Sequence, residues 1–506
     1  MLSASSRRPL FASRRASLPG ERALFLGAFG LLLALTLVPV LAARYPAMAD
    51  YPNHLARMSL LVELADAPAL QEHYAVLERP VANLGMDLLI PPLAALGMEL
   101  EAAGRAFVGL TLALFCTGVV VLGWASQRRP PWLALLVFAF AYNLYVIYGF
   151  LNYFFGLGMA FLTLALWIRT PALNPWIRLA IFSALGTLLL AIHLMAFGVY
   201  GLAVAAWAAG ERGFSPRRLA EPLAQFIVPV LLYLTAFQHT GGFDFYYDDP
   251  VKSKLLGAAG LFLGYSRLAD GALALAVLAG AAWLVLRRRW TLPCRGAGAA
   301  LATMTAAFIA LPFYAMGSWM LDSRLSVPVL ALALAFVALP PLEAASRRTA
   351  IVLAVCLGAL VVPRTWTVAT HWQVASNAFA EVRAALAAVT PGARVATVQI
   401  KSGVGVEFPP LRHAAAFAVV DRHAMIPNLF AYPFNGESVA FREHLLPIAA
   451  RHRFPTLRGA ERPDWDSLAA NFDYVLVIGL PLAAVPGAFR PLTGGNGFHL
   501  VKSPRP

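Results

Sequence analysis

Long apolar stretches separated by short polar segments occupy most of the chain up to about residue 363. These stretches approach the roughly 20 residues that an α-helix needs to cross a bilayer. We therefore predict a polytopic α-helical membrane protein with about eleven transmembrane helices. The expected spans include residues 23–43, 105–126, 132–148, 220–237 and 350–362.

Arginine clusters recur between the apolar stretches, among them Arg128-Arg129, Arg287-Arg288-Arg289 and Arg347-Arg348. The chain is 59% hydrophobic, and 40 Lys and Arg against 26 Asp and Glu give a net charge of +14. Because basic loops stay on the cytoplasmic side of a membrane, the clusters predict a cytoplasmic N-terminus and polar, aromatic turns on the outer side. This bias explains the positive charge, and no nucleic-acid partner is expected.

Residues 1–22 form a basic tail ahead of the first apolar stretch, and this arrangement is typical of a signal sequence. The small-x-small triplet Ala47-Met48-Ala49 even offers a cleavage pattern just before Asp50. The apolar run is longer than the hydrophobic region of a secretory signal, roughly 7–15 residues, so we expect an uncleaved anchor. Residues 23–363 are then the transmembrane domain, with a long outer loop at 44–100, called the first loop below.

Residues 364–506 are less apolar, and their pattern predicts a soluble C-terminal α/β domain on the periplasmic side. Helical periodicity over 379–389 is followed by strand patterns at 394–400, 472–479 and 498–501. The sequence of this domain contains no Gly-rich phosphate loop and no Gly-x-Ser-x-Gly turn. We expect it to act as a lid or to dock the acceptor.

The first loop begins with a concentration of ionisable residues, Arg44 to Arg57, directly after the first span. Asp50 could serve there as a general base towards an incoming hydroxyl, or hold a divalent cation that activates it indirectly. An interfacial loop with solvated charges is the simpler alternative. His54 would share a helical face with Asp50, but Pro52 argues against a helix, so we interpret His54 as a hydrogen-bonding loop residue.

Basic side chains on the outer side are candidates for binding phosphate, because a guanidinium group can contact two phosphate oxygens at once. Arg57 and Arg324 qualify, although Arg324 could instead pair with Asp322 or extend to lipid head groups. His193, between two apolar spans, is either a phosphate donor or a buried structural histidine. Asn152, Asn83 and Asp87 are expected to orient loops or to contact a sugar.

Three stretches together resemble uncharacterised bacterial members of the GT-C superfamily of membrane glycosyltransferases, which use polyprenyl-phosphate-linked sugars. They are Asp50-Tyr51-Pro52-Asn53-His54, Tyr148-Gly149-Phe150-Leu151-Asn152 and Asp322-Ser323-Arg324. The resemblance covers residues 20–365 or so and is more architectural than motif-specific. It implies that Asp50 is the catalytic base or a metal-associated residue, and that Arg324, or else His193, contacts the lipid phosphate.

Many members of that superfamily carry two neighbouring acids in this loop, whereas here Tyr51 follows Asp50 and the next acid is Glu63. This departure leaves the need for a divalent cation open, and no other cofactor is expected. The expected site residues are the base Asp50 and, for substrate or lipid phosphate, Arg324, His193, Arg57, His54, Asn152 and Asp322.

The resemblance implies an inverting glycosyltransferase in a bacterial inner membrane, with membrane lipids around it. Its partners would be a polyprenyl-phosphate-linked sugar donor and a glycan, lipid or protein acceptor. A transporter or flippase of lipid-linked sugars is a rival from another class, although no internal repeat typical of transporters is evident. A non-catalytic membrane protein of envelope assembly is a third interpretation.

Overall fold

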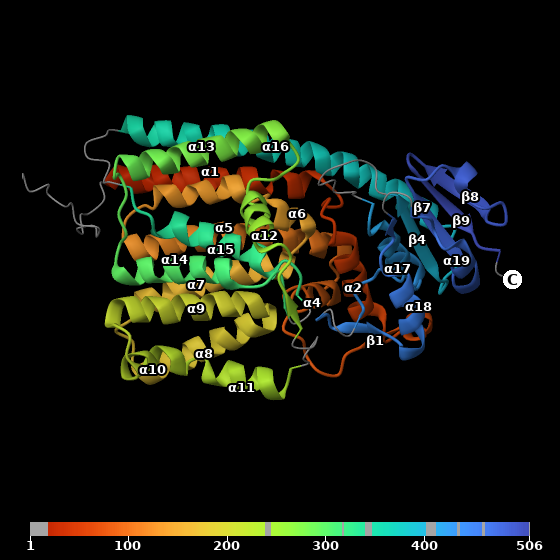
Figure 1. Cartoon of the computed structure of the whole chain (residues 1–506), viewed down its shortest axis with the longest axis horizontal. Coiled ribbons are helices and arrows are strands. Elements are labelled where there is room, and N and C mark those ends of the chain that lie inside the picture. The colour runs from red at the N-terminus through yellow and green to blue at the C-terminus, as the bar shows by residue number, and fades with distance from the viewer. Residues whose placement is uncertain are drawn as a thin grey trace, which may run out of the picture.

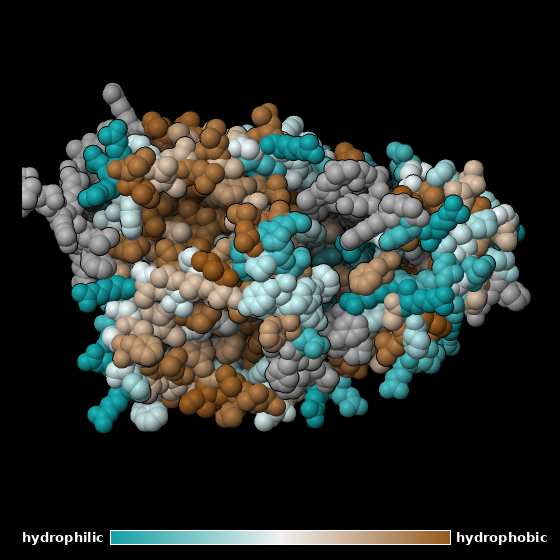
Figure 2. All heavy atoms as spheres, viewed as in Figure 1, coloured by the Kyte–Doolittle hydropathy of each residue, from teal (hydrophilic) through white to brown (hydrophobic). Residues whose placement is uncertain are grey.

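The computed structural model describes residues 19–237, 244–315, 318–339, 347–400, 411–432, 436–457 and 461–504. A bundle of helices with nearly aligned axes forms one half of the molecule, and a sheet-containing domain forms the other (Figure 1). Figure 2 shows apolar side chains gathered over the helical half and hydrophilic side chains over the sheet-containing half. The prediction of a mostly helical chain with a sheet-containing region towards the C-terminus is therefore confirmed.

Seven helices among the described residues are long and apolar enough to cross a membrane, and a bent pair would bring the number to eight. This supports a membrane protein but not the expected number of about eleven spans. The seven helices are α1 (Pro19–Ala42), α5 (Leu100–Gln127), α7 (Leu151–Arg169), α8 (Pro175–Ile192), α9 (Leu194–Arg212), α13 (Arg267–Leu286) and α16 (Arg347–Leu386).

Two of the expected spans are broken in the structure. The stretch 132–148 forms the 3-10 helix η1 (Trp132–Phe140) and the short α6 (Leu144–Tyr148), because the Asn143 side chain caps a new helix between them. The stretch 220–237 lies within α10 (Pro216–Ala224) and α11 (Ile227–Thr235), which meet at a bend of 62°. Each of these helical pieces is therefore shorter than the continuous apolar span that the hydropathy pattern predicts.

Two further bundle helices are too short for a full crossing. The helices α14 (Arg295–Ala310) and α15 (Leu321–Phe336) have 16 residues each. At 1.5 Å per residue, such a helix is about 24 Å long, below the roughly 30 Å of a hydrocarbon core. They nevertheless pack inside the bundle, α14 against α9 and α15 against α5.

The long helix α16 carries the chain from the bundle into the C-terminal domain (Figure 1). It runs for 40 residues without a break at the expected domain boundary, although Pro363 lies inside it. The next residue, Arg364, pairs with Asp270 of α13 at 2.7 Å and so fixes α16 to the bundle. The helix expected over 379–389 is therefore the end of α16, which stops at Leu386.

The C-terminal domain is built on a five-stranded sheet with the strand order β6-β4-β7-β9-β8. The predicted strands are confirmed as β4 (Val395–Ile400), β7 (Tyr474–Ile478) and β9 (Phe498–Lys502). β4 and β7 are parallel, whereas β9 runs antiparallel to β7. Further elements of this domain include β6 (Thr456–Leu457), β8 (Arg490–Gly495), α17 (Phe417–Arg422), α18 (Leu446–Arg451) and α19 (Trp465–Asn471).

The first loop contains short helices, as expected, and also a strand that joins it to the C-terminal domain. Its elements are α2 (Tyr51–Glu63), α3 (Pro68–Gln71), β1 (Tyr74–Val76) and α4 (Ile90–Ala95). β1 pairs antiparallel with β5 (Val439–Phe441), and Tyr74 lies opposite Phe441. Two segments more than 350 residues apart in sequence thus form one small sheet.

A buried ionic cluster strengthens this connection. Arg57 of α2, with a side chain only 2% exposed, lies 2.8 Å from Asp87 and also pairs with Glu437 of the C-terminal domain. Ser438 Oγ donates to Asp87 at 2.5 Å. The guanidinium group that the sequence offered as a phosphate ligand is therefore occupied by two carboxylates, and its role here is to hold the first loop against the C-terminal domain.

Replacing Arg57 with Met should destabilise the protein by about 3–5 kcal/mol, because two buried carboxylates would lose their cation. The thermal unfolding midpoint in detergent micelles is the measurement. Arg451→Met is the matched control, since its pair with Asp464 is exposed (63% and 49%) and such pairs contribute little. Equal shifts for the two variants would contradict the structural role of Arg57.

Candidate active site

Asp50 occupies the N-cap position of α2, and Pro52 lies in the first turn of that helix. A proline is tolerated there because the first N–H groups of a helix have no acceptor within it. The expectation that Pro52 prevents a helix is therefore wrong. The His54 N–H donates to the Asp50 carbonyl at 3.0 Å, so both residues belong to the same turn.

The side chain of Asp50 is not used to cap its helix. An N-cap aspartate usually accepts a hydrogen bond from the backbone two or three residues on, but Asp50 makes no such bond among the described residues. Its carboxylate instead lies among basic groups, with Oδ1 3.6 Å from His413 Nε2. The side chain is 18% exposed, so the carboxylate stays accessible to a small group of a substrate.

The turn at Tyr148–Asn152 packs directly against Asp50 and fixes its backbone. The Asp50 N–H donates to the Tyr148 carbonyl at 3.0 Å. Gly149 has φ +103°, and a Cβ built on it would lie 3.0 Å from the Asp50 Cβ, so a side chain would not fit there. His54 Nε2 donates to the Gly149 carbonyl at 3.0 Å, in keeping with its interpretation as a hydrogen-bonding residue.

Two guanidinium groups act on Asp50 from different parts of the molecule. Arg324, at the start of α15, lies over the Phe150 ring with its Cζ 4.2 Å from the centroid and donates to the Trp319 carbonyl. Arg412 comes from the C-terminal domain, just before α17. Within the described part of the chain, the Nε atoms of both arginines are buried without a hydrogen-bond partner. The site therefore holds cationic donors with capacity for an anion.

Burial decides the charge states around Asp50. It raises the pKa of Asp50 to about 7, although Arg412 and Arg324 act in the opposite direction. Burial, assisted by Arg412 and His54, holds the pKa of His413 well below its ordinary value. Burial likewise lowers the pKa of His54 to about 3, with Arg57 contributing. Near neutral pH, the site thus combines a carboxylate that can accept a proton with two neutral histidines.

His193 lies close to Arg324 and also caps a helix. Its Nδ1 accepts a hydrogen bond from the Met195 N–H at 3.2 Å, so it caps α9. Its ring packs against Tyr153 with centroids 5.4 Å apart, and the Tyr153 hydroxyl donates to the Arg324 carbonyl at 2.9 Å. Arg324 is near enough to influence His193 electrostatically.

Asn152 and Asp322 are engaged in contacts that position loops and helices. The Asn152 amide donates to the Asn83 carbonyl at 2.7 Å and accepts from the Met86 N–H at 2.9 Å. Asp322 accepts from Ser253 at 2.8 Å and pairs with Lys254 at 2.6 Å, both on α12 (Pro250–Ala259). Asp322 is thus bound to α12, and the alternative of a local Asp322–Arg324 pair is not what the structure contains.

Arg412 and His413 were not singled out from the sequence. They adjoin a C-terminal domain helix in a region without a catalytic motif, and only the folded chain brings them to Asp50. No group of three or more His, Cys, Asp or Glu among the described residues could hold a metal ion. The described site therefore offers a base and cations rather than a ligand set for a metal.

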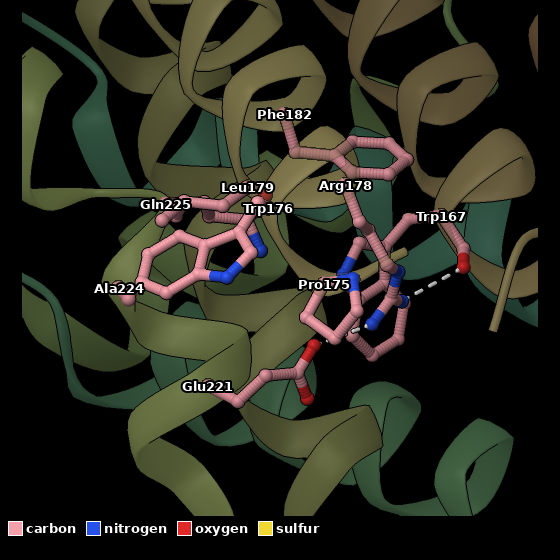
Figure 3. A pocket seen from close by; sticks show the side chains of 9 residues that line it. All are labelled: Trp167, Pro175, Trp176, Arg178, Leu179, Phe182, Glu221, Ala224 and Gln225. Atoms are coloured by element: carbon pink, nitrogen blue, oxygen red, sulfur yellow. Dashed lines mark hydrogen bonds and ion pairs between the residues drawn. The ribbon is translucent and has the colours of Figure 1, made fainter. Parts of the chain in front are cut away.

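A separate pocket of about 190 Å³ lies between α7, α8 and α10 (Figure 3). Inside it, Arg178 pairs with Glu221 at 2.7 Å and donates to the Trp167 carbonyl at 3.1 Å. This pocket is at the end of the bundle remote from the C-terminal domain (Figure 1), and none of the expected site residues lines it.

The sequence matches no protein-family model and no curated protein.

Asp50→Asn should raise the thermal unfolding midpoint at pH 8 by about 2 °C or more, and less at pH 5. The folded pKa of Asp50, about 7, lies above its ordinary value of 3.8. The stabilising contribution of the protonated carboxyl is therefore complete below about pH 4 and is lost as pH rises through 7. Asparagine mimics the protonated carboxyl and avoids that loss. Scanning fluorimetry at both pH values is the measurement.

The matched control for this stability measurement is Asp66→Asn, because Asp66 is exposed and lies three residues beyond α2. Its effect on the midpoint should not change between pH 5 and pH 8. An Asp50→Asn midpoint below that of the wild type at pH 8 would show that the charged carboxylate stabilises the fold instead.

Proposed function

We propose that the protein is a membrane glycosyltransferase of the GT-C type. It would move a sugar from a polyprenyl-phosphate donor to an acceptor hydroxyl, with inversion, and Asp50 would be the base. The observation that carries this proposal is a largely buried carboxylate, with its pKa raised to about 7, near two arginines whose Nε–H groups have no hydrogen-bond partner among the described residues. A base near neutrality and cations for a departing phosphate are the two groups that such a transfer requires.

The proposed reaction is a single displacement. The acceptor oxygen forms a bond to the anomeric carbon while the bond from that carbon to the phosphate oxygen breaks. The acceptor proton passes to the Asp50 carboxylate, and the phosphate leaves with the electron pair. Arg324 and Arg412 are suited to stabilise the charge that develops on the phosphate, because the Nε–H of each is buried without a hydrogen-bond partner among the described residues.

The ends of the bundle support a reaction on the outer face of a bacterial inner membrane. Arg128, Arg212 and Arg287 follow or end helices at the end of the bundle remote from the C-terminal domain. Basic ends of this kind stay on the cytoplasmic side, so the proposal has the N-terminus in the cytoplasm and the C-terminal domain in the periplasm. A lipid-linked donor would reach Asp50 from the outer leaflet.

The phosphate of the donor is assigned first to Arg324 and second to His193. Arg57 is left out of this assignment, because Asp87 and Glu437 already neutralise it. The acceptor, whether a glycan, a lipid or a protein, would approach along the C-terminal domain, which supplies Arg412. The proposed chemistry needs no metal, and a divalent cation would have to be held chiefly by Asp50.

Asp50→Asn should lower sugar transfer by about 10²–10⁴-fold, because the amide cannot accept the proton. The assay supplies radiolabelled polyprenyl-phosphate sugars in proteoliposomes and counts label that leaves the lipid. The wild-type rate should rise with pH and level off above about 7, as Asp50 becomes ionised. Asp66→Asn is the control. Unchanged transfer by Asp50→Asn would contradict the proposed mechanism. Label that crosses the bilayer but stays on the lipid would indicate a flippase.

Arg324→Ala should lower kcat/KM for the lipid donor by about 10²-fold, and Arg324→Lys by less, since lysine keeps the charge but loses two-point contact with phosphate. Arg451→Ala, on the exposed surface, is the control for a lost arginine. Wild-type kinetics for Arg324→Lys would mean that Arg324 contributes only a general positive charge near the lipid head groups.

A further inference from the structure

A buried cluster of three polar residues adjoins Asp50. Its members are His413, Asn53 and Asn428. The exposed fractions of the three residues are 4%, 0% and 3%. Asn53 belongs to α2, whereas His413 and Asn428 belong to the C-terminal domain, so the cluster spans the contact between the two parts. His413 Nδ1 lies 2.8 Å from Asn53 Nδ2 and 3.4 Å from Asn428 Nδ2. The mechanism proposed above makes no use of these residues.

The contacts of the two amides fix which ring nitrogen of His413 carries the proton. Asn53 Nδ2 also lies 3.1 Å from the Asn428 carbonyl, which can only accept, so this atom of Asn53 must be the NH₂ nitrogen. Asn428 Nδ2 lies 3.4 Å from the Arg412 carbonyl, which requires the same orientation. Both amides therefore donate towards Nδ1. A neutral ring that accepts at Nδ1 carries its proton on Nε2.

The Nε2 proton points towards Asp50. His413 Nε2 and Asp50 Oδ1 are 3.6 Å apart, so a movement of about 0.5 Å would give a hydrogen bond of ordinary length. The charged and titratable groups that also face Asp50 are Arg412, Arg324 and Tyr148. Those that face His413 are Arg412 and His54, and the Phe430 ring closes one side with its centroid 5.3 Å away.

We propose that His413 is a positioning residue for Asp50, because Asn53 and Asn428 hold its ring in the tautomer whose Nε2–H orients the Asp50 carboxylate. The statement that His413 assists a general base rests on the proposed function. The interaction between the His413 and Asp50 side chains does not depend on that function. The C-terminal domain would thus complete the base of the active site in addition to covering it.

The test compares His413→Gln with His413→Asn in the full-length protein in liposomes. The glutamine amide nitrogen reaches the place of Nε2 and can still donate to Asp50, whereas the asparagine amide lies near the place of Nδ1 and can contact only Asn53 and Asn428. A hydrophobic carbodiimide reacts with protonated carboxyl groups, and mass spectrometry of the peptide that contains Asp50 gives the labelled fraction from pH 5 to pH 9. This readout needs no transferase activity.

The labelling midpoint of the wild type is expected near pH 7, with His413→Gln close to it and His413→Asn about one pH unit higher, because a donor to the carboxylate is lost. The acid limb of kcat/KM for sugar transfer should move in parallel. His413→Phe, which keeps the ring volume, replaces His413→Asn should the latter unfold. Midpoints that agree for the wild type and all variants would overturn the proposal.

The two proposals fail in different ways. If the labelling midpoints shift as expected while the wild type transfers no sugar, the interaction between His413 and Asp50 stands and the glycosyltransferase proposal falls. If sugar transfer depends on Asp50 while His413→Asn leaves both the labelling midpoint and the pH profile unchanged, the enzyme proposal stands and His413 is only a packing residue.

Discussion

A carboxylate held largely away from bulk water near two guanidinium groups is the constraint that the rest of the structure maintains. Burial disfavours the charged form of the Asp50 carboxyl. Arg324 and Arg412 offset only part of this effect, because the pKa of Asp50 stays raised to about 7. The three side chains come from the start of α2, the start of α15 and the segment before α17. The balance therefore exists only while the first loop, the bundle and the C-terminal domain keep their places.

Several independent contacts keep the three parts together. The strands β1 and β5 pair the first loop with the C-terminal domain, and Arg57 bridges the same two parts through Asp87 and Glu437. On α16, Arg383 pairs with Glu101 of α5 at 2.5 Å and with Asp421 of α17 at 2.5 Å. The first two contacts join the first loop to the C-terminal domain, and the Arg383 pairs join α16 to α5 and to α17. The relative position of Asp50 and Arg412 is therefore determined by several contacts rather than by one hinge.

Hydropathy predicts the parts of this fold that depend on local pattern. The strands β4 and β7 are buried along nearly their whole length, so their apolar runs identify them. Asp50 stands out as the acid within the concentration of ionisable residues that follows the first span. The pair of Arg57 with Glu437 and the β1–β5 pairing escape such reasoning, because their partners lie more than 350 residues away. The prediction that Pro52 prevents a helix is wrong because the effect of a proline depends on its position. A proline is tolerated in the first turn of a helix but not in its interior.

The short helix α15 explains how a cation comes to lie beside the carboxylate. At about 24 Å, a 16-residue helix cannot reach both faces of a hydrocarbon core of roughly 30 Å, so its polar first turn begins within the bundle rather than above it. Charges in such a place are costly unless they are paired. Asp322 meets that condition with Lys254, whereas Arg324 has no carboxylate within ion-pair distance among the described residues. Phe150 and the Trp319 carbonyl hold this arginine in place, and it is the cation that the proposed function assigns to the phosphate of the donor.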